Sequence, residues 1–416
     1  MITLKGALMA KEKWYGWYIV FISAFIGIGM TSAYPQFTMV VEELSIQLGT
    51  TKEFLLFSDT VKSMTIIVAM LLSGAIYSKL KLKGTFLFSM SCLLITLVIF
   101  PSLTTSFWVI PLKIIQGFSA VIFPVFILTI IDWIEQSKMG TATALFNGIF
   151  YGGAGFGATI SGFAVELYGW KSSFYIVALV IFVPAVLWFF TVNRRDKKQT
   201  EEITMDSSPS GKMLGKIIRL PEVWLLIGCF ISTIWIIQVL SVDLPLFGNH
   251  LGYGASTIGL LMTSLSFGIF AAAIISGRAS DIASRNSKIS IKGRLKVFLV
   301  GPSLTILSIV LVMVADLSSP FLFYSTILLL SFGSSWGIGS FYCMLPELLE
   351  GKVLDYSTGF IGGIADIGMS VGPLIFGVVF AVRGLWTLGW LSCILISLVS
   401  AVSCLLLIKR SSKVIQ

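Results

Sequence analysis

Long apolar runs separated by short polar loops make up almost the whole chain. Roughly 20 apolar residues cross a bilayer as one helix, and twelve runs have about that length. Only helices and closed barrels satisfy their backbone polar groups in lipid, and these lengths fit helices. The pattern therefore predicts an all-α membrane protein with twelve transmembrane helices, over residues 15–38, 54–78, 85–102, 107–131, 141–165, 172–192, 222–247, 257–280, 296–315, 320–345, 357–382 and 386–408.

One long polar segment, residues 194–220, interrupts the apolar runs near the middle of the chain. It carries seven lysines and arginines with a Ser-Ser-Pro-Ser-Gly stretch among them. Such a low apolar content does not sustain a packed core, so we expect a mobile linker. The linker would join an N-terminal six-helix bundle, residues 1–193, to a C-terminal one, residues 221–416.

The two halves also resemble each other. The fifth and eleventh spans are both glycine-stepped and end in a turn followed by a tryptophan, Trp170 or Trp386. The second span ends in Ser73–Ser78 and the eighth in the similar Ser276–Asp281. Two pseudo-symmetric bundles of this kind place a binding site at their interface and work by rocking one half against the other.

Composition and charge distribution favour a lipid-facing surface. The chain is 56% hydrophobic and 12% charged, whereas soluble domains are roughly 45–50% apolar and about 25% charged. Of 29 lysines and arginines, 24 fall in the termini, the linker and the loops of one side, and 3 in the opposite loops. Because cytoplasmic loops are enriched in these residues, we expect a multi-pass plasma-membrane protein with both termini in the cytoplasm. The same distribution explains the net charge of +9 without nucleic-acid binding.

The sequence contains no motif typical of a metal site or a catalytic site. The five cysteines lie in apolar runs without a CxxC pair, and the chain has one histidine. We therefore expect no disulfide scaffold, no metal site and no cofactor. GxSxG, Walker and HExxH motifs do not occur, so we expect no enzyme.

Several of these segments resemble signatures of the major facilitator superfamily of secondary transporters. The loop after the second span carries Gly-x-x-x-Asp in that family, as in Gly277–Asp281, whereas Gly74–Ser78 has serine at the acidic place. The fourth-span signature Arg-x-x-x-Gly occurs as Lys113–Gly117, with lysine in place of arginine. The resemblance covers essentially the whole chain and implies the family's fold of twelve helices in two bundles.

Two further segments concern the branch of the family. The opening Tyr15–Tyr18 resembles bacterial monocarboxylate and oxalate/formate-type members, although the arginine that those carriers place in the eighth span is Ala273 here. The Gly-Pro of antiporters occurs as Gly157-Ala158, without its proline.

Ionisable residues within a membrane span are costly and are site candidates by default. Asp366 lies about nine residues into the eleventh span, near mid-membrane by helical rise. A carboxyl that loads a proton when wet and is neutral when buried suits proton coupling. The alternative is that Asp366 hydrogen-bonds within its helix and only holds packing.

A second candidate group lies on the second and fourth spans. Asp59 and Lys62 are three residues apart and share a helix face, and Lys113 has a similar depth in the fourth span. One acid and two bases leave a local charge of +1, which suits a carboxylate substrate, and Asp59 is a second proton-coupling candidate. Gln116, one turn after Lys113, would add a hydrogen bond. Alternatively the lysines snorkel outward to the interface.

Other polar and aromatic side chains are candidates for the cavity wall, with plain packing as the alternative for each. They are Thr31, Tyr34, Asn147, Tyr151, Trp235, Gln238, Trp336 and Tyr342.

Small residues predict where the halves meet on the cytoplasmic side. Gly74 and Gly277 allow close helix approach. Asp281 beside Arg278 and Arg285 would form a charge latch on this inner gate.

The function that these observations favour is alternating-access transport of a small organic anion, a carboxylate by expectation, coupled to protons. The expected partners are the small-molecule substrate, the proton and the lipid bilayer, with the protein a monomer. Two alternatives stay open, a drug/proton antiporter that exports lipophilic cations and a membrane sensor that transports nothing.

Overall fold

A computed structural model describes residues 2–193, 210–253, 255–380 and 384–411. All regular secondary structure in these ranges is helical. The α-helices are α1 (Ile2–Met39), α2 (Val41–Leu48), α3 (Lys52–Ile99), α4 (Val109–Gly117), α5 (Ile122–Trp133), α6 (Met139–Tyr168), α7 (Trp170–Thr191), α8 (Ser210–Ile218), α9 (Pro221–His250), α10 (Ala255–Asn286), α11 (Ser290–Val314), α12 (Pro320–Phe341), α13 (Leu345–Leu348), α14 (Gly351–Ala365), α15 (Ile367–Pro373) and α16 (Trp386–Arg410). Short 3₁₀ segments are η1 (Phe100–Ser102), η2 (Ser106–Trp108), η3 (Phe118–Val121), η4 (Gln136–Lys138) and η5 (Tyr342–Met344), and η6 (Leu374–Phe380) is a π-helix.

The predicted all-α membrane architecture is confirmed. Among the described residues, 10 helices are long and apolar enough to cross a membrane. The predicted span 54–78 lies in α3, and the span 85–102 comprises the end of α3 and η1. Between them, Lys81 has a φ of 58° and interrupts the helical backbone. The predicted span 107–131 comprises α4, η3 and α5, and the span 141–165 lies in α6.

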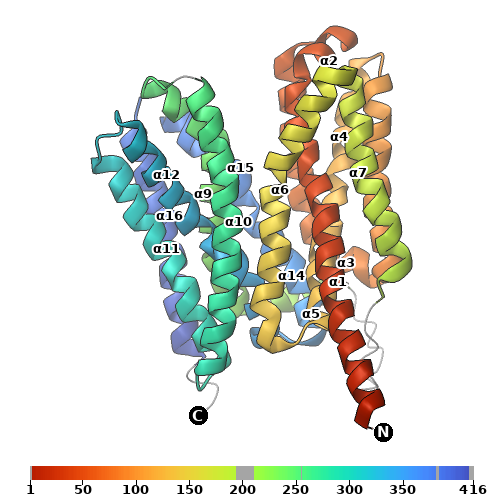
Figure 1. The fold of residues 1–416 in the computed structure, drawn as a ribbon, viewed down its shortest axis with the longest axis vertical. Coiled ribbons are helices and arrows are strands. Elements are labelled where there is room, and N and C mark those ends of the chain that lie inside the picture. The colour runs from red at the N-terminus through yellow and green to blue at the C-terminus, as the bar shows by residue number, and fades with distance from the viewer. Residues whose placement is uncertain (1, 194–209, 254, 381–383, 412–416) are drawn as a thin grey trace.

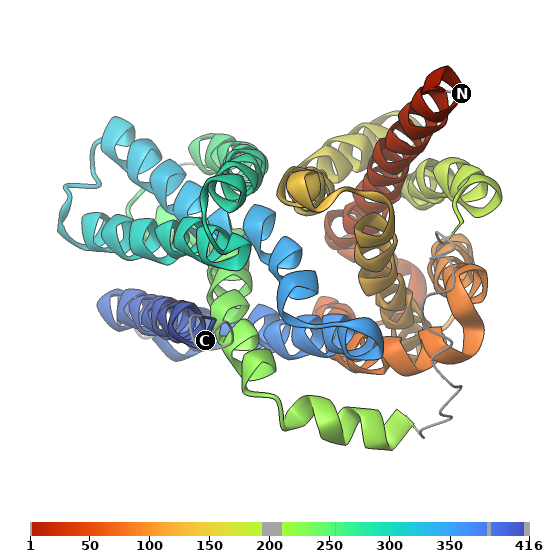
Figure 2. The same ribbon diagram turned by 90° about the horizontal axis from the view of Figure 1, so that it is seen from below.

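The helices form two groups (Figure 1). One contains α1–α7 and the other contains α9–α12, α15 and α16, while α14 reaches across to α3 of the first group. Both termini lie at the same end of the molecule. The groups come together at that end and stand apart at the opposite end. We retain 1–193 and 221–416 as proposed bundle boundaries. Of the predicted linker, residues 194–209 lie outside the described residues, and Ser210–Ile218 form α8, which lies at the edge of the molecule when seen from below (Figure 2).

Glycines permit the close contacts between the two groups. A methyl group on Gly140 of α6 would lie 2.6 Å from the carbonyl oxygen of Gly277 on α10. A methyl group on Gly74 of α3 would lie 3.0 Å from the Cα atom of Tyr356 on α14. Larger side chains at these positions would push the helices apart, so the sequence pattern of small residues sets where the halves touch.

Candidate functional site

A cavity of about 1120 Å³ lies between the two helix groups. Its wall is mostly apolar and aromatic, with a few polar groups contributed from both sides. A large apolar cavity with a small number of convergent polar groups is the usual form of a small-molecule site. The polar lining residues singled out by the sequence are Thr31, Asp59, Lys62, Gln116, Tyr151, Gln238 and Asp366.

Asp59, Lys62 and Lys113 form a compact charged cluster at this wall. The Nζ atom of Lys62 lies 2.6 Å from Oδ1 of Asp59, and Nζ of Lys113 lies 2.8 Å from the same oxygen. Both lysine side chains are nearly inaccessible, whereas the Asp59 side chain is 26% exposed. The cluster has two cations and one anion, so it keeps a net charge of +1.

Close packing of α4 on α3 brings Lys113 to this cluster. A methyl group on Gly117 would lie 2.9 Å from the carbonyl oxygen of Lys62, so only glycine permits this approach. The Lys113 ammonium also lies 3.0 Å from the ring centroid of Phe37 on α1. A cation over an aromatic face in a desolvated place is stabilised by roughly 2 kcal/mol. The ring and the carboxylate together hold the ammonium in the protein interior, against the alternative of an outward snorkel.

Asp366 lies where the helix of the eleventh span is interrupted, between α14 and α15. Its backbone N–H donates to the carbonyl of Gly362 at 2.8 Å, and its side chain contributes to the cavity wall. Within the described ranges, no cation pairs with this carboxylate. It therefore differs from Asp59, whose charge two lysines compensate.

The neutral polar candidates divide between the cavity wall and the protein interior. Gln116 lines the cavity, and its Oε1 atom has no hydrogen-bond partner among the described residues. Thr31 lines it too, although its hydroxyl donates to carbonyls of its own helix. Tyr151 and Gln238 are partly exposed in the wall.

Four predicted lining residues are not part of the described wall. The Trp336 indole donates to the carbonyl of Val297 at 2.8 Å and packs on α11. Trp235 is buried against α15, and Asn147 donates to the carbonyl of Thr143 at 2.9 Å. Lys113 contacts the wall residue Asp59 and is not itself part of the wall. The two tryptophans thus pack on helices of their own bundle, and the Asn147 amide bonds within its own helix. Spacing along one helix does not predict which neighbouring helix each face contacts. The side chain of Tyr34 lies outside the described residues.

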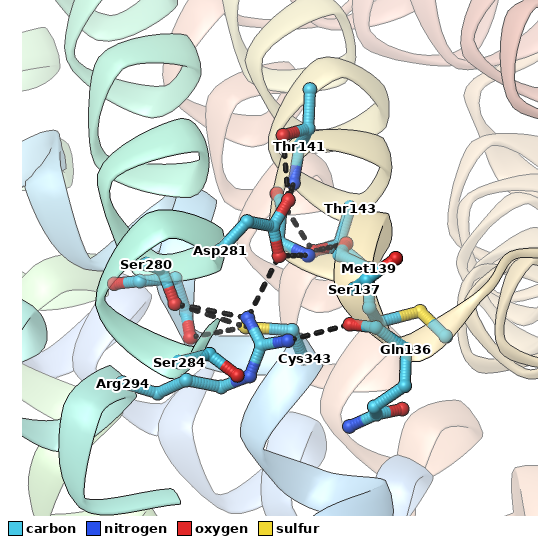
Figure 3. Close-up of polar contacts among 12 residues, drawn as sticks. Gln136, Ser137, Met139, Thr141, Thr143, Ser280, Asp281, Ser284, Arg294 and Cys343 are labelled. Atoms are coloured by element: carbon cyan, nitrogen blue, oxygen red, sulfur yellow. Dashed lines mark hydrogen bonds and ion pairs between the residues drawn. The ribbon is translucent and has the colours of Figure 1, made fainter. Parts of the chain in front are cut away.

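A polar network joins the two helix groups at the end that carries the termini (Figure 3). Asp281 of α10 accepts hydrogen bonds from the backbone N–H groups of Gly140 and Thr141, at 2.8 and 2.7 Å, and from the Thr141 hydroxyl at 2.6 Å. Its carboxylate thus caps the N-terminus of α6, where the helix dipole favours an anion.

Arg294 of α11 completes this network. Its Nη1 atom lies 2.9 Å from Oδ1 of Asp281, its Nε atom 2.6 Å from Oε1 of Glu347, and its Nη2 atom donates to the carbonyl of Gln136 at 2.7 Å. The cation that pairs with Asp281 is therefore Arg294, and not Arg278 or Arg285 as the sequence predicted. Arg278 is exposed, and Arg285 donates to the carbonyl of Ser137 at 2.6 Å.

Sequence reasoning missed Arg294 and Glu347. Both lie near span ends, where cations and acids also occur for reasons of topology, so no local signal separates them from loop charges. It also missed Phe123, which lines the cavity opposite the predicted wall residue Tyr342, with the two ring centroids 5.7 Å apart. Aromatic residues occur in most spans, and only the fold shows which of them meet.

Comparisons with known proteins agree with this architecture. The solved structure of the human organic anion transporter MFSD10 (TETRAN) is similar in fold, with a TM-score of 0.71 and 13% identity, over 95% of this chain and 99% of that one. At this identity the similarity concerns the fold alone. A search of curated protein sequences finds no match.

Within the described residues no group of three or more His, Cys, Asp or Glu side chains is placed to hold a metal ion.

The family model of the Major Facilitator Superfamily matches residues 17–292 and 235–415. The chain therefore belongs to the Major Facilitator Superfamily and is a secondary transporter of the membrane, not an enzyme.

Proposed function

We propose that this transporter carries a small organic anion, a carboxylate, by alternating access. The observation that supports this most is the pair of buried lysines that share one carboxylate beside the cavity. A buried site with a net charge of +1 attracts an anion because its charge is then compensated. Lys62 is the lysine that contacts the substrate, since it lines the cavity, and Gln116 adds a hydrogen bond.

Proton coupling is the second part of the proposal, with Asp366 as its main residue. A carboxylate without a cation partner in an apolar wall is costly, whereas the neutral acid is not. Asp366 would therefore carry a proton in the occluded site and release it when one side opens to water. Uptake of the anion would then be driven by acid on the outer side.

The positive-inside bias supports an orientation with the termini in the plasma-membrane cytoplasm. The network of Asp281 and Arg294 would then close the cytoplasmic side, and the cavity would open outward. The substrate enters from outside, and breaking the network lets the two bundles rock to the inward-open state.

The experiment is a thermal-shift screen of the purified protein against carboxylates, amino acids, sugars and cations, followed by uptake in proteoliposomes. Selective stabilisation by carboxylates and acid-driven uptake of the stabilising anion are the expected results. Lys62→Met should abolish both, whereas Arg278→Gln, an exposed cation removed elsewhere, should change neither. Stabilisation by sugars or amino acids alone would contradict the proposal.

A second candidate function, proton-driven export of lipophilic cations, is favoured by the aromatic wall and by Asp366. Aromatic faces and an uncompensated acid suit a cation. The net charge of +1 at the lysine cluster opposes it. Growth of a pump-deficient host on ethidium, with and without the protein, separates the two functions, because only the exporter confers resistance.

A further inference from the structure

Asp59 stands between the two lysines and the cavity. Its side chain is 26% exposed, whereas those of Lys62 and Lys113 are 4% and 1% exposed. Both ammonium groups donate to the same carboxylate oxygen, Oδ1, at 2.6 and 2.8 Å. An anion in the cavity therefore meets the Asp59 carboxylate before it reaches either ammonium group.

We propose that Asp59 is an internal counter-anion that the substrate anion displaces, and that Asp59 takes up one proton from the outer solution as it leaves the lysines. This inference rests on the proposed function and adds how the anion and a proton are coupled at the same site. The substrate carboxylate takes the place of Asp59 at the lysines. The one covalent change is the O–H bond formed on Asp59.

Repulsion between the two carboxylates favours uptake of the proton. With Asp59 ionised, the cluster holds a charge of +1. An added anion would bring two carboxylates face to face beside the lysines, and carboxylates that share a site do not both stay ionised. One proton on Asp59 returns the cluster to two cations and one anion, as in the empty site.

The surroundings of Asp59 leave few other groups to take that proton. Among the described residues, the charged groups that face it are Lys62 from α3 itself and Lys113 from α4, and α1 contributes the apolar ring of Phe37 against Lys113. The other titratable residues in the described cavity wall are Tyr151 of α6, Tyr342 of η5 and Asp366. Asp366 belongs to the opposite bundle and is not paired with either lysine.

The test is the pH dependence of anion binding by the purified full-length protein. Lactate and benzoate, the two weakly basic carboxylates that stay ionised over this range, are titrated by thermal shift at pH 5.5, 6.5 and 7.5. If each anion brings one proton, the dissociation constant of the wild type should rise about tenfold per pH unit. Asp59→Asn, which imitates the protonated acid, should bind independently of pH and at least tenfold more tightly at pH 7.5.

Two controls separate Asp59 from its neighbours. Asp366→Asn should keep the pH dependence of binding, since its carboxylate is not the one displaced. Because Asp59→Asn leaves two buried cations uncompensated, the double variant Asp59→Asn/Lys113→Met is included as one that buries a single cation. It restores a net charge of +1 with one lysine and should bind the anion without pH dependence.

Two outcomes overturn the inference. Wild-type affinity and a wild-type pH slope in both Asp59 variants would show that Asp59 is not displaced, while the organic-anion function would stand. If no carboxylate stabilises the wild type or any variant, the inference and the proposed function fall together.

Discussion

The substitution Asp281→Asn tests whether the network of Asp281 and Arg294 holds the two bundles together. Of the hydrogen bonds that Asp281 accepts, three come from α6 of the other bundle, two from the N–H groups of Gly140 and Thr141 and one from the Thr141 hydroxyl. An asparagine of the same shape keeps one acceptor oxygen, but its NH2 group would face donors. The variant therefore loses bonds that exist only while the bundles touch.

The magnitude follows from the number of bonds lost. A hydrogen bond to a charged group contributes about 1.5–3 kcal/mol. Losing two of them at the lower value raises the free energy of the closed state by about 3 kcal/mol. A change of 1.4 kcal/mol is tenfold in an equilibrium constant. The fraction of molecules whose bundles are separated at this network should therefore increase on the order of 100-fold.

The assay uses Cys343 as a reporter inside the network. Its sulfur lies 3.3 Å from Nη1 of Arg294, and the residue is fully buried. Maleimide should modify it only when the bundles separate, so peptide mass spectrometry should find faster labelling in Asp281→Asn. Cys393, fully buried in the same bundle, reports general unfolding and should label no faster.

A matched control removes a charge nearby without touching the network. Arg278→Gln, at an exposed position on the same helix, should leave the labelling rate of Cys343 within about twofold of wild type, as expected for a surface charge. The reasoning is refuted if Asp281→Asn also stays within this range while Cys393 remains protected.

The remaining predictions concern the cavity and the helix contacts. Asp366→Asn should lower the number of protons taken up per anion in proteoliposomes by one, because Asp59 still takes up its own proton with the anion; an unchanged proton-to-anion ratio would remove Asp366 from coupling. Lys113→Met should leave a neutral Asp59–Lys62 pair and therefore lower the affinity for the anion at least tenfold, and retained affinity in thermal-shift titrations would contradict this. Its unfolding free energy should stay within about 1 kcal/mol of the wild-type value, since the cost of burying the second cation also disappears. Gly277→Val should place its Cβ against Ala144 and weaken the closed state by about 1–3 kcal/mol through overpacking, which faster labelling of Cys343 would report and unchanged labelling would exclude.

Much of the fold followed from the apolar runs because the bilayer imposes a length and a backbone requirement that few sequences satisfy otherwise. Within the described residues the predicted spans fall on helical segments, with one interruption at Asp366, and the loop expected after the second span appears as the break at Lys81. The short outer helix α2 was missed. Its eight residues carry Glu42 and Glu43, and such short polar helices give no membrane signal.

The candidate site was predictable in its residue types and only partly in its geometry. Asp59, Lys62 and Asp366 stand out because an ionisable residue in a span is rare. That Lys113 reaches Asp59 depends on Gly117 and on the packing of α4 against α3, which spacing along one helix does not contain. Tryptophan is a residue type that is common in cavity walls, yet Trp235 and Trp336 pack against helices of their own bundle.

By itself the sequence determined the membrane environment, the helical class, the repeat of two halves and the few ionisable groups within the spans, because these depend on local composition and on periodicity. The tertiary structure alone decided which charges meet: two lysines on one Asp59 oxygen, an uncompensated Asp366, and Arg294 rather than Arg278 at Asp281. The physical reason is that an ion pair needs atoms within about 4 Å, and only the packing of distant helices brings them that close.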